Sequence, residues 1–137
     1  MTLGQWSDHI ETGVASMDTE HQLQVRLIDA LDAQLRAGND PALGAETLTQ
    51  LVDVTSVHYL AEELLMRLYS YPQYEMHVLE HGRLMEQVRQ VQREQAAGDE
   101  AAALDTIGRL REWLTTHIKH HDQAFSLWCA KHAIEPA

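Results

Sequence analysis

Nine histidines stand against a single phenylalanine in this chain of 137 residues. Three of the nine lie in the stretch HIKHHDQAF at residues 117–125, which also carries an aspartate and a lysine. Histidine is the commonest metal ligand in proteins, and carboxylate oxygens bind many of the same metals. The stretch therefore fits either part of a buried metal site or a charged face exposed to solvent, and the other histidines decide between the two.

Histidines elsewhere follow the helical spacing of the apolar residues. His58 and Glu62 are four residues apart, as are His77 and His81, so each pair shares one face of an α-helix. A single histidine on an apolar face is usually a core residue that hydrogen bonds to a carbonyl group. Here each of four predicted helices places a histidine where a core residue is expected, namely His21, His58, His77, His81 and His117. Burying these groups without partners would cost several kcal/mol, so the pattern predicts a metal centre.

The ligand types indicate which metal is bound. Cys129 is the only cysteine, which disfavours a thiolate site for structural zinc or copper(I). Five or six histidines and two carboxylates are too many for one ion, so two ions bridged by carboxylates fit better. Two iron(II) ions, two carboxylates and one hydroxide leave a residual charge of about +1, which a buried site tolerates. A non-haem di-iron centre is the main hypothesis, and a di-manganese centre competes with it.

Three clusters of turn residues divide the chain into helical segments. The clusters are AGNDP at 37–41, YSYPQ at 69–73 and AAGDE at 96–100. Gly38 and Gly98 can each end a helix, while Asp40 with Pro41, and then Asp99, can begin the next one. The predicted helices run roughly over residues 18–37, 41–68, 73–97 and 99–131.

These four segments predict an all-α fold, an up-down-up-down antiparallel four-helix bundle. The residues before the first helix are expected to form an N-terminal arm laid against the bundle and anchored by Trp6. A length of 137 residues suits a single domain, here residues 1–137, with one buried core.

Charge and composition disfavour several kinds of partner and location. The chain has 10 lysines and arginines against 21 aspartates and glutamates, a net charge of −11 with neutral histidines. Nucleic acid and anionic membrane surfaces require a clustered basic surface, so neither is expected as a partner. No apolar run is long enough to cross a bilayer, and no secretory signal is visible at the N-terminus. Because Cys129 has no partner for an internal disulfide, a cytoplasmic location is expected. The sequence does not determine the oligomeric state, and a monomer is favoured.

Four segments together carry the pattern of a known family. They are GVASMDTEH at 13–21, HYLAEELLM at 58–66, YPQYEMHVLEH at 71–81 and WLTTHIKHHD at 113–122. They resemble the hemerythrins, specifically the single-domain bacterial ones, and the resemblance extends from Trp6 to about Trp128. It is specific because the spacings H-x3-E, H-x3-H and H-x4-D occur in the family's order.

The resemblance implies two iron ions joined by an oxo or hydroxo group. One iron would be held by His77, His81 and His117, the other by His21 and His58, and Glu62 and Asp122 would bridge them. The second iron then has one ligand fewer, and oxygen binds reversibly at its open position in the family.

The resemblance also implies an apolar oxygen pocket. Leu114 matches a family position that lines this pocket, and Trp113 beside it is a second candidate. Tyr59 departs from the family, in which phenylalanine is common, and brings a hydroxyl group near the site. His120 and His121 replace more ordinary residues beside Asp122 and are not expected to be ligands.

Reversible oxygen binding for transport, storage or delivery is the function expected from this resemblance, with molecular oxygen as the ligand and no enzymatic activity. A free-standing oxygen or redox sensor and an iron store are alternatives. A di-iron oxidase or peroxidase of the ferritin-like class would rely on Glu-x-x-His pairs, and the chain contains none.

Helical spacing and the resemblance disagree about the last ligand. Four residues return to the same face of a helix, which selects His121 as the partner of His117. The resemblance selects Asp122, which a straight α-helix would place about 140° from His117. We therefore predict a π-bulge or widened turn between His117 and Asp122, a feature frequent at functional sites.

Overall fold

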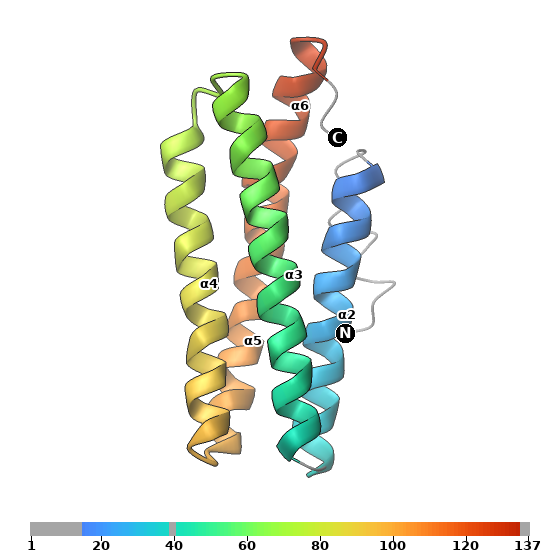
Figure 1. Ribbon diagram of the computed structural model, residues 1–137, viewed down its shortest axis with the longest axis vertical. Coiled ribbons are helices and arrows are strands. Elements are labelled where there is room, and N and C mark those ends of the chain that lie inside the picture. Colours follow the sequence, from blue (N-terminus) through green and yellow to red (C-terminus); the bar gives the residue numbers. More distant parts are fainter. Residues whose placement is uncertain (1–14, 39–40, 135–137) are drawn as a thin grey trace.

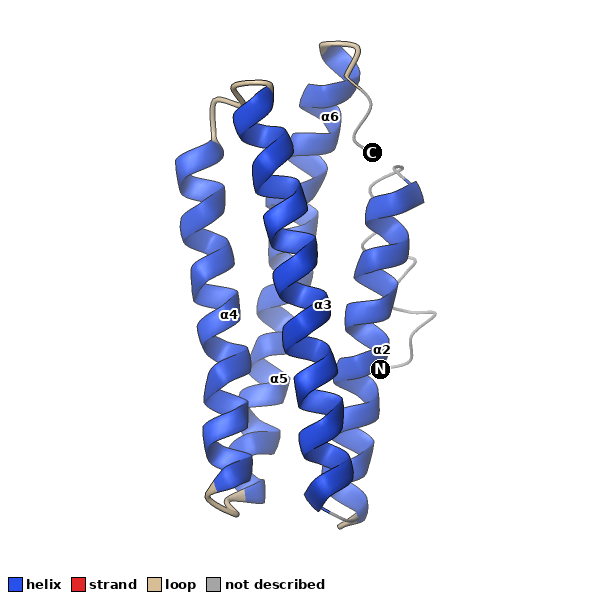
Figure 2. Cartoon of the chain, viewed as in Figure 1, coloured by secondary structure: helices blue, strands red, loops and turns tan. Residues whose placement is uncertain are grey.

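The computed structural model describes residues 15–38 and 41–134, and every regular element in this part of the chain is helical. The elements are α2 (Ala15–Ala37), α3 (Pro41–Leu68), α4 (Tyr74–Ala96), α5 (Glu100–His117), η1 (Ile118–Asp122) and α6 (Gln123–Lys131). The last three follow one another without a break, so the chain forms four long helical rods (Figures 1 and 2). The prediction of an all-α four-helix bundle is confirmed.

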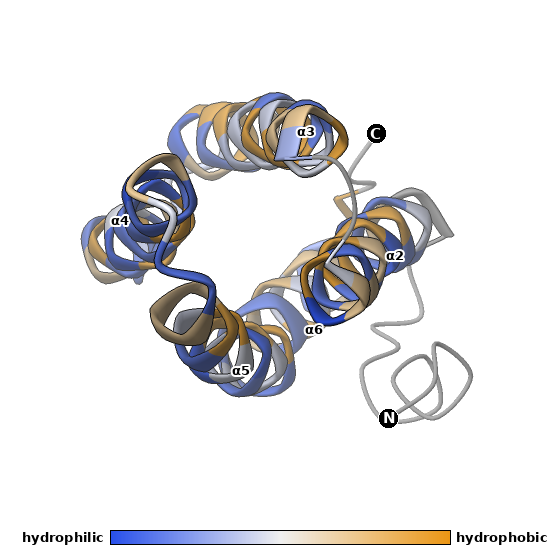
Figure 3. Cartoon of the chain, turned by 90° about the horizontal axis from the view of Figure 1, so that it is seen from below, coloured by the Kyte–Doolittle hydropathy of each residue, from blue (hydrophilic) through white to orange (hydrophobic). Residues whose placement is uncertain are grey.

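The four rods surround a common axis, as the end-on view in Figure 3 shows. Each rod contacts two others, because α2 packs on α3 and α5, and α4 packs on α3 and α5. None of the described helices is both long and apolar enough to cross a bilayer. The expected N-terminal arm lies outside the described residues, except that residues 15–17 belong to α2.

Turn residues end the helices close to the predicted places. Gly98 follows α4 with a φ of 77°, a left-handed conformation that glycine adopts without steric penalty. Asp99 then caps α5, and its carboxylate accepts a hydrogen bond of 3.1 Å from the backbone N–H of Ala102. A cap of this kind stabilises a helix by about 1 kcal/mol.

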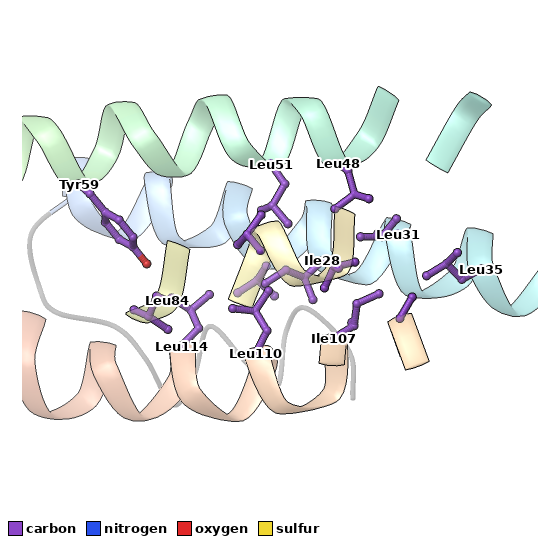
Figure 4. Packing of buried hydrophobic residues seen from close by; sticks show 14 of the residues in the cluster. Ile28, Leu31, Leu35, Leu48, Leu51, Tyr59, Leu84, Ile107, Leu110 and Leu114 are labelled. Atoms are coloured by element: carbon purple, nitrogen blue, oxygen red, sulfur yellow. The ribbon is translucent and has the colours of Figure 1, made fainter. Parts of the chain in front are cut away.

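The interior of the described part of the chain contains two apolar clusters. The larger one fills the bundle between the four rods with leucine, isoleucine and valine side chains, including Leu31, Leu51 and Leu84 (Figure 4). The smaller cluster contains Met17, Met66, Tyr71, Phe125 and Cys129. Each fully buried large apolar side chain contributes about 1.5–3 kcal/mol, so these clusters hold the rods together.

A layer of buried polar residues lies between the two clusters. On α3, for example, His58 and Glu62 come between Leu51 of the larger cluster and Met66 of the smaller one. The same order holds on the other rods. Met17 on α2 and Phe125 on α6 belong to the smaller cluster, while Leu84 on α4 belongs to the larger one. The bundle thus positions polar side chains from every rod at one level, with apolar residues on either side.

Candidate metal centre

All seven predicted metal ligands lie in this polar layer, and each is at most 4% exposed. Helix α2 supplies His21, α3 supplies His58 and Glu62, α4 supplies His77 and His81, α5 supplies His117, and η1 supplies Asp122. Four separate rods therefore direct imidazole and carboxylate groups to one point inside the bundle.

The π-helical turn η1 brings Asp122 to the layer. The backbone N–H of Gln123 donates to the carbonyl oxygen of Ile118, five residues earlier. The turn η1 therefore contains one residue more than an α-helical turn. Asp122 consequently shares a face with His117, and its Oδ1 lies 3.1 Å from Nε2 of that histidine. The predicted π-bulge is confirmed.

The seven residues form two groups that share both carboxylates. One group holds Glu62, His77, His81, His117 and Asp122, and the other holds His21, His58, Glu62 and Asp122. The candidate ligand atoms within each group lie within 4.8 Å of one another. Three histidines thus gather on one side of the two carboxylates and two histidines on the other.

Each carboxylate directs one oxygen to each side. Glu62 Oε1 lies 2.5 Å from Nε2 of His77 and 3.2 Å from Nε2 of His81, while its Oε2 lies 3.5 Å from Nε2 of His58. Carboxylates placed between two sets of imidazoles are suited to bridging two cations.

Asp122 is oriented in the same way. Its Oδ1 lies 3.0 Å from Nε2 of His77, on the side with three histidines. Its Oδ2 lies 3.0 Å from Nε2 of His21, on the side with two. Both carboxylates therefore span the boundary between the groups.

Electrostatics in the layer favour positive charge. Burial alone would raise the pKa of Asp122, but the imidazoles of His117, His21 and His77 beside it hold that pKa well below its ordinary value. Burial and Asp122 would likewise raise the pKa of Glu62, yet His77 and His81 keep it lowered. Burial would lower the pKa of His77, and the two carboxylates instead raise it to about 9. Two buried anionic groups thus require protonated imidazoles or metal cations around them.

Metal ions fit the layer because its inward atoms are otherwise unsatisfied. Nε2 of all five histidines and all four carboxylate oxygens are buried, and no group in the described chain satisfies them with a hydrogen bond. Several of these atoms approach one another closely, as Nε2 of His77 and Oε1 of Glu62 do at 2.5 Å. Buried polar atoms are normally paired, so this set of nitrogen and oxygen donors is able to hold metal.

Three further carboxylates contact the layer from outside, and sequence reasoning missed them. Glu20, Glu63 and Glu80, hereafter the outer carboxylates, face Nδ1 of His58, His81 and His117 respectively. A signal was present in the sequence, since each outer carboxylate directly precedes or follows a residue of the polar layer.

The residues expected to line an oxygen pocket lie beside the layer. Leu114 is buried in the larger apolar cluster, and the partly buried Trp113 packs against that cluster. Tyr59 stacks on His81 with ring centroids 3.9 Å apart and planes nearly parallel, and it belongs to the same cluster as Leu114 (Figure 4). Burial raises the pKa of the Tyr59 phenol well above its ordinary value, so this hydroxyl stays protonated.

The two remaining histidines of the 117–125 stretch lie outside the two groups. His120 is exposed. His121 is partly buried with its ring centroid 5.3 Å from that of His117, and it forms a separate group with Glu80 and His117.

Comparison with known proteins agrees with this geometry. The family model of the hemerythrin HHE cation binding domain matches residues 12–128. A bacteriohemerythrin of Pseudomonas paraeruginosa is 31% identical over 121 residues, which cover 88% of this chain and 77% of that protein. The bacteriohemerythrin of Ralstonia nicotianae is 28% identical over 131 residues, covering 96% and 92% of the two chains. That of Methylococcus capsulatus is 27% identical over 126 residues, covering 91% and 95%.

The family match spans most of the chain and includes every rod of the bundle. It is a match to a cation-binding domain, and the buried cluster of histidine, glutamate and aspartate is able to hold metal. The resemblance noted in the sequence is therefore confirmed, and this chain belongs to the hemerythrin family, whose members bind non-haem iron.

Proposed function

We propose that this protein binds molecular oxygen reversibly at a non-haem di-iron centre, as an oxygen carrier, store or delivery protein rather than an enzyme. The observation that carries the proposal is the unequal division of the polar layer. Three histidines form one group with the two carboxylates, and two histidines form the other group with the same carboxylates.

This division supports the ligand roles that the resemblance implies. His77, His81 and His117 would hold one iron, His21 and His58 would hold the other, and Glu62 and Asp122 would bridge the pair. The side with two histidines has one protein ligand fewer, which leaves a position for oxygen. When bound, the iron pair supplies that open position and the electrons that a reversible exchange with oxygen requires.

The surrounding residues keep the site dry. Leu114 and Trp113 line the oxygen pocket in this proposal, and their support is that Leu114 is 2% exposed and Trp113 packs on the same apolar cluster. An apolar wall limits access of water and protons, which would promote irreversible oxidation.

Partner and location belong to the same proposal. Oxygen is the ligand, and a net charge of −11 argues against nucleic acid as a partner. The protein acts as a monomer in the cytoplasm, where a free, buried thiol such as Cys129 is usual.

One preparation tests the function. The protein is loaded with iron, iron per chain is counted, and the sample is reduced under argon before oxygen is admitted and removed again. An absorption spectrum that cycles with oxygen over several rounds is the expected result, with about two irons per chain.

Other outcomes would assign other functions. Irreversible oxidation in one pass contradicts a carrier and points to a redox sensor or an oxidase. An iron content well above about two per chain would instead indicate an iron store.

A further inference from the structure

We infer that the outer carboxylates Glu20, Glu63 and Glu80 are positioning residues that enrich the metal site in electron density. Glu20 and Glu63 fix the tautomer and orientation of two ligand histidines by direct contact, and Glu80 acts on a third through its charge. The inference rests on the proposed function, because it concerns the outer side of the same metal centre.

Three contacts define the arrangement. Glu63 Oε2 lies 2.8 Å from Nδ1 of His81. Glu20 Oε2 contacts Nδ1 of His58 directly. Glu80 Oε1 lies 4.0 Å from Nδ1 of His117, a nitrogen that is fully buried with no hydrogen-bond partner in the described chain. All three contacts use Nδ1.

The opposite nitrogen of each ring faces the layer. Nε2 of His81 lies 3.2 Å from Glu62, and Nε2 of His58 lies 3.5 Å from the same residue. Nε2 of His117 lies 3.1 Å from Asp122. Each imidazole therefore stands between an inner carboxylate, which is a candidate bridge, and an outer one.

Hydrogen-bond chemistry then determines the tautomer. An ionised carboxylate only accepts hydrogen bonds, so the ring nitrogen that faces it must carry the proton. With the proton on Nδ1, the lone pair remains on Nε2 and points at the centre. A carboxylate in this position raises the basicity of the ligand imidazole and holds its ring in place.

Helix geometry explains why each outer carboxylate is adjacent to an inner residue. Neighbouring residues on an α-helix are about 100° apart. When one residue points to the bundle axis, the residue directly before or after it therefore points toward an adjoining rod. Glu20 follows this rule beside His21, Glu63 beside Glu62, and Glu80 beside His81.

The contacts run around the bundle in chain order. Glu20 of α2 reaches a histidine of α3, Glu63 of α3 reaches one of α4, and Glu80 of α4 reaches one of α5. Three of the four rods thus each orient a ligand on the next rod, which couples the packing of the bundle to the geometry of the metal site.

Burial and contact distance together rank the three residues by their expected effect on the site. The side chain of Glu63 is 23% exposed, that of Glu80 is 12% exposed, and that of Glu20 is 44% exposed. Solvent screens Glu20 most, and Glu80 lies beyond hydrogen-bond distance. Glu63 combines a short contact with burial, so its substitution should have the largest effect.

The test compares Glu63→Gln and Glu63→Ala with the control Glu46→Gln. Glu46 is exposed on the same helix, roughly 25 Å along it from Glu63, so the control makes the same change of charge far from the site. Zinc serves as a redox-inert probe, and its affinity is measured by competition with a chromophoric chelator. The midpoint potential is then measured on the iron-loaded proteins.

Glu63→Gln keeps the shape and an acceptor oxygen but removes the charge, so the midpoint potential should rise while about two zinc ions still bind. Glu63→Ala should weaken zinc binding by about 10–100-fold. The control should change neither quantity. Long-range proton–nitrogen NMR of the zinc-loaded wild type should show the proton of His58 and His81 on Nδ1.

Two results would overturn the inference: an unchanged potential and zinc affinity in both Glu63 variants, or a proton on Nε2 of His81 in the zinc-loaded protein. Should Glu63→Ala fail to fold, Glu63→Gln and Glu80→Gln still give the potential. A wild type that binds fewer than about two metal ions contradicts the proposed function instead, so the two failures are distinguishable.

Discussion

Glu62, like Asp122, would contact both metal positions of the proposed centre. One of its oxygens faces His77 and His81 and the other faces His58, and the side chain is 4% exposed. A carboxylate in that place neutralises charge on both sides at once, which no single histidine of the layer does.

Glu62→Ala should therefore lose metal and stability together. Iron per chain should fall from about two to fewer than one, and the midpoint of thermal unfolding of the iron-loaded protein should fall by roughly 10 °C or more. Iron analysis and differential scanning calorimetry measure the two effects. Glu46→Ala, an exposed change on the same helix, should alter neither. Full iron content in Glu62→Ala would show that the bridging role is wrong.

Tyr59 is expected to affect the durability of the proposed oxygen site rather than its metal content. Its ring stacks on His81, and its phenol stays protonated because burial raises its pKa well above the ordinary value. A buried proton donor beside a reduced metal site favours irreversible oxidation.

Tyr59→Phe keeps the stacked ring and removes only the hydroxyl group. It should retain iron and slow the loss of oxygen-binding capacity in air by several-fold, because one proton source has been removed. Repeated spectra of the oxygenated protein follow that loss. Tyr71→Phe makes the same chemical change in the smaller apolar cluster and serves as the control. An equal or faster loss in Tyr59→Phe would contradict this role.

At the scale of elements, the π-helical turn η1 has the largest effect on the site, because it determines where Asp122 lies. An uninterrupted α-helix would direct Asp122 away from His117, whereas the extra residue in η1 places their atoms 3.1 Å apart. The turn also allows α6 to present Phe125 and Cys129 to the smaller apolar cluster.

An alanine inserted after the exposed Lys119 should place Asp122 six residues beyond His117 and rotate it out of the layer by about 100°. Deletion of the exposed Ala124 in the same variant restores the register of the rest of α6, so the protein should fold. Its iron content should still fall to about one per chain or less, while Lys119→Ala should keep both irons. Two irons in the insertion–deletion variant would show that Asp122 does not bridge.

The sequence predicted the rods and the inward face because both depend on local spacing. His58 with Glu62, and His77 with His81, share a face at a spacing of four residues, whatever the partner helix is. Periodicity alone would have chosen His121 as the last ligand, and only the resemblance to hemerythrins pointed to Asp122 and hence to η1. That the seven residues of the polar layer are metal ligands is still a prediction.

The outer carboxylates were not predicted because their contacts cross between rods. Glu63 looks like an exposed acidic residue on its own helix, and its contact with His81 appears only once α3 and α4 are packed together. The rotation of one rod against another is set by tertiary packing, which the spacing of residues in one helix does not contain.

At the scale of the whole molecule, the polar layer makes stability depend on what supplies its positive charge. Without metal, protonated imidazoles must neutralise Glu62 and Asp122. The pKa of His77 is raised from 6.5 to about 9, so its contribution to stability is fully present below pH 6.5 and is lost as the pH rises through 9. The pKa values of Glu62 and Asp122 are lowered, so their contribution is lost as the pH falls through those values.

Metal removal should therefore both lower the stability of the bundle and change its pH dependence. The metal-free protein should unfold at a lower urea concentration at pH 9 than at pH 6.5, because deprotonated histidines leave the two carboxylates unpaired. The metal-loaded protein should lose little stability over the same interval, since cations replace the protons and their binding favours the folded state. Urea titrations of zinc-loaded and chelator-treated protein at the two pH values make the comparison. Parallel pH dependence in the two forms would mean that the layer is not where the metal binds.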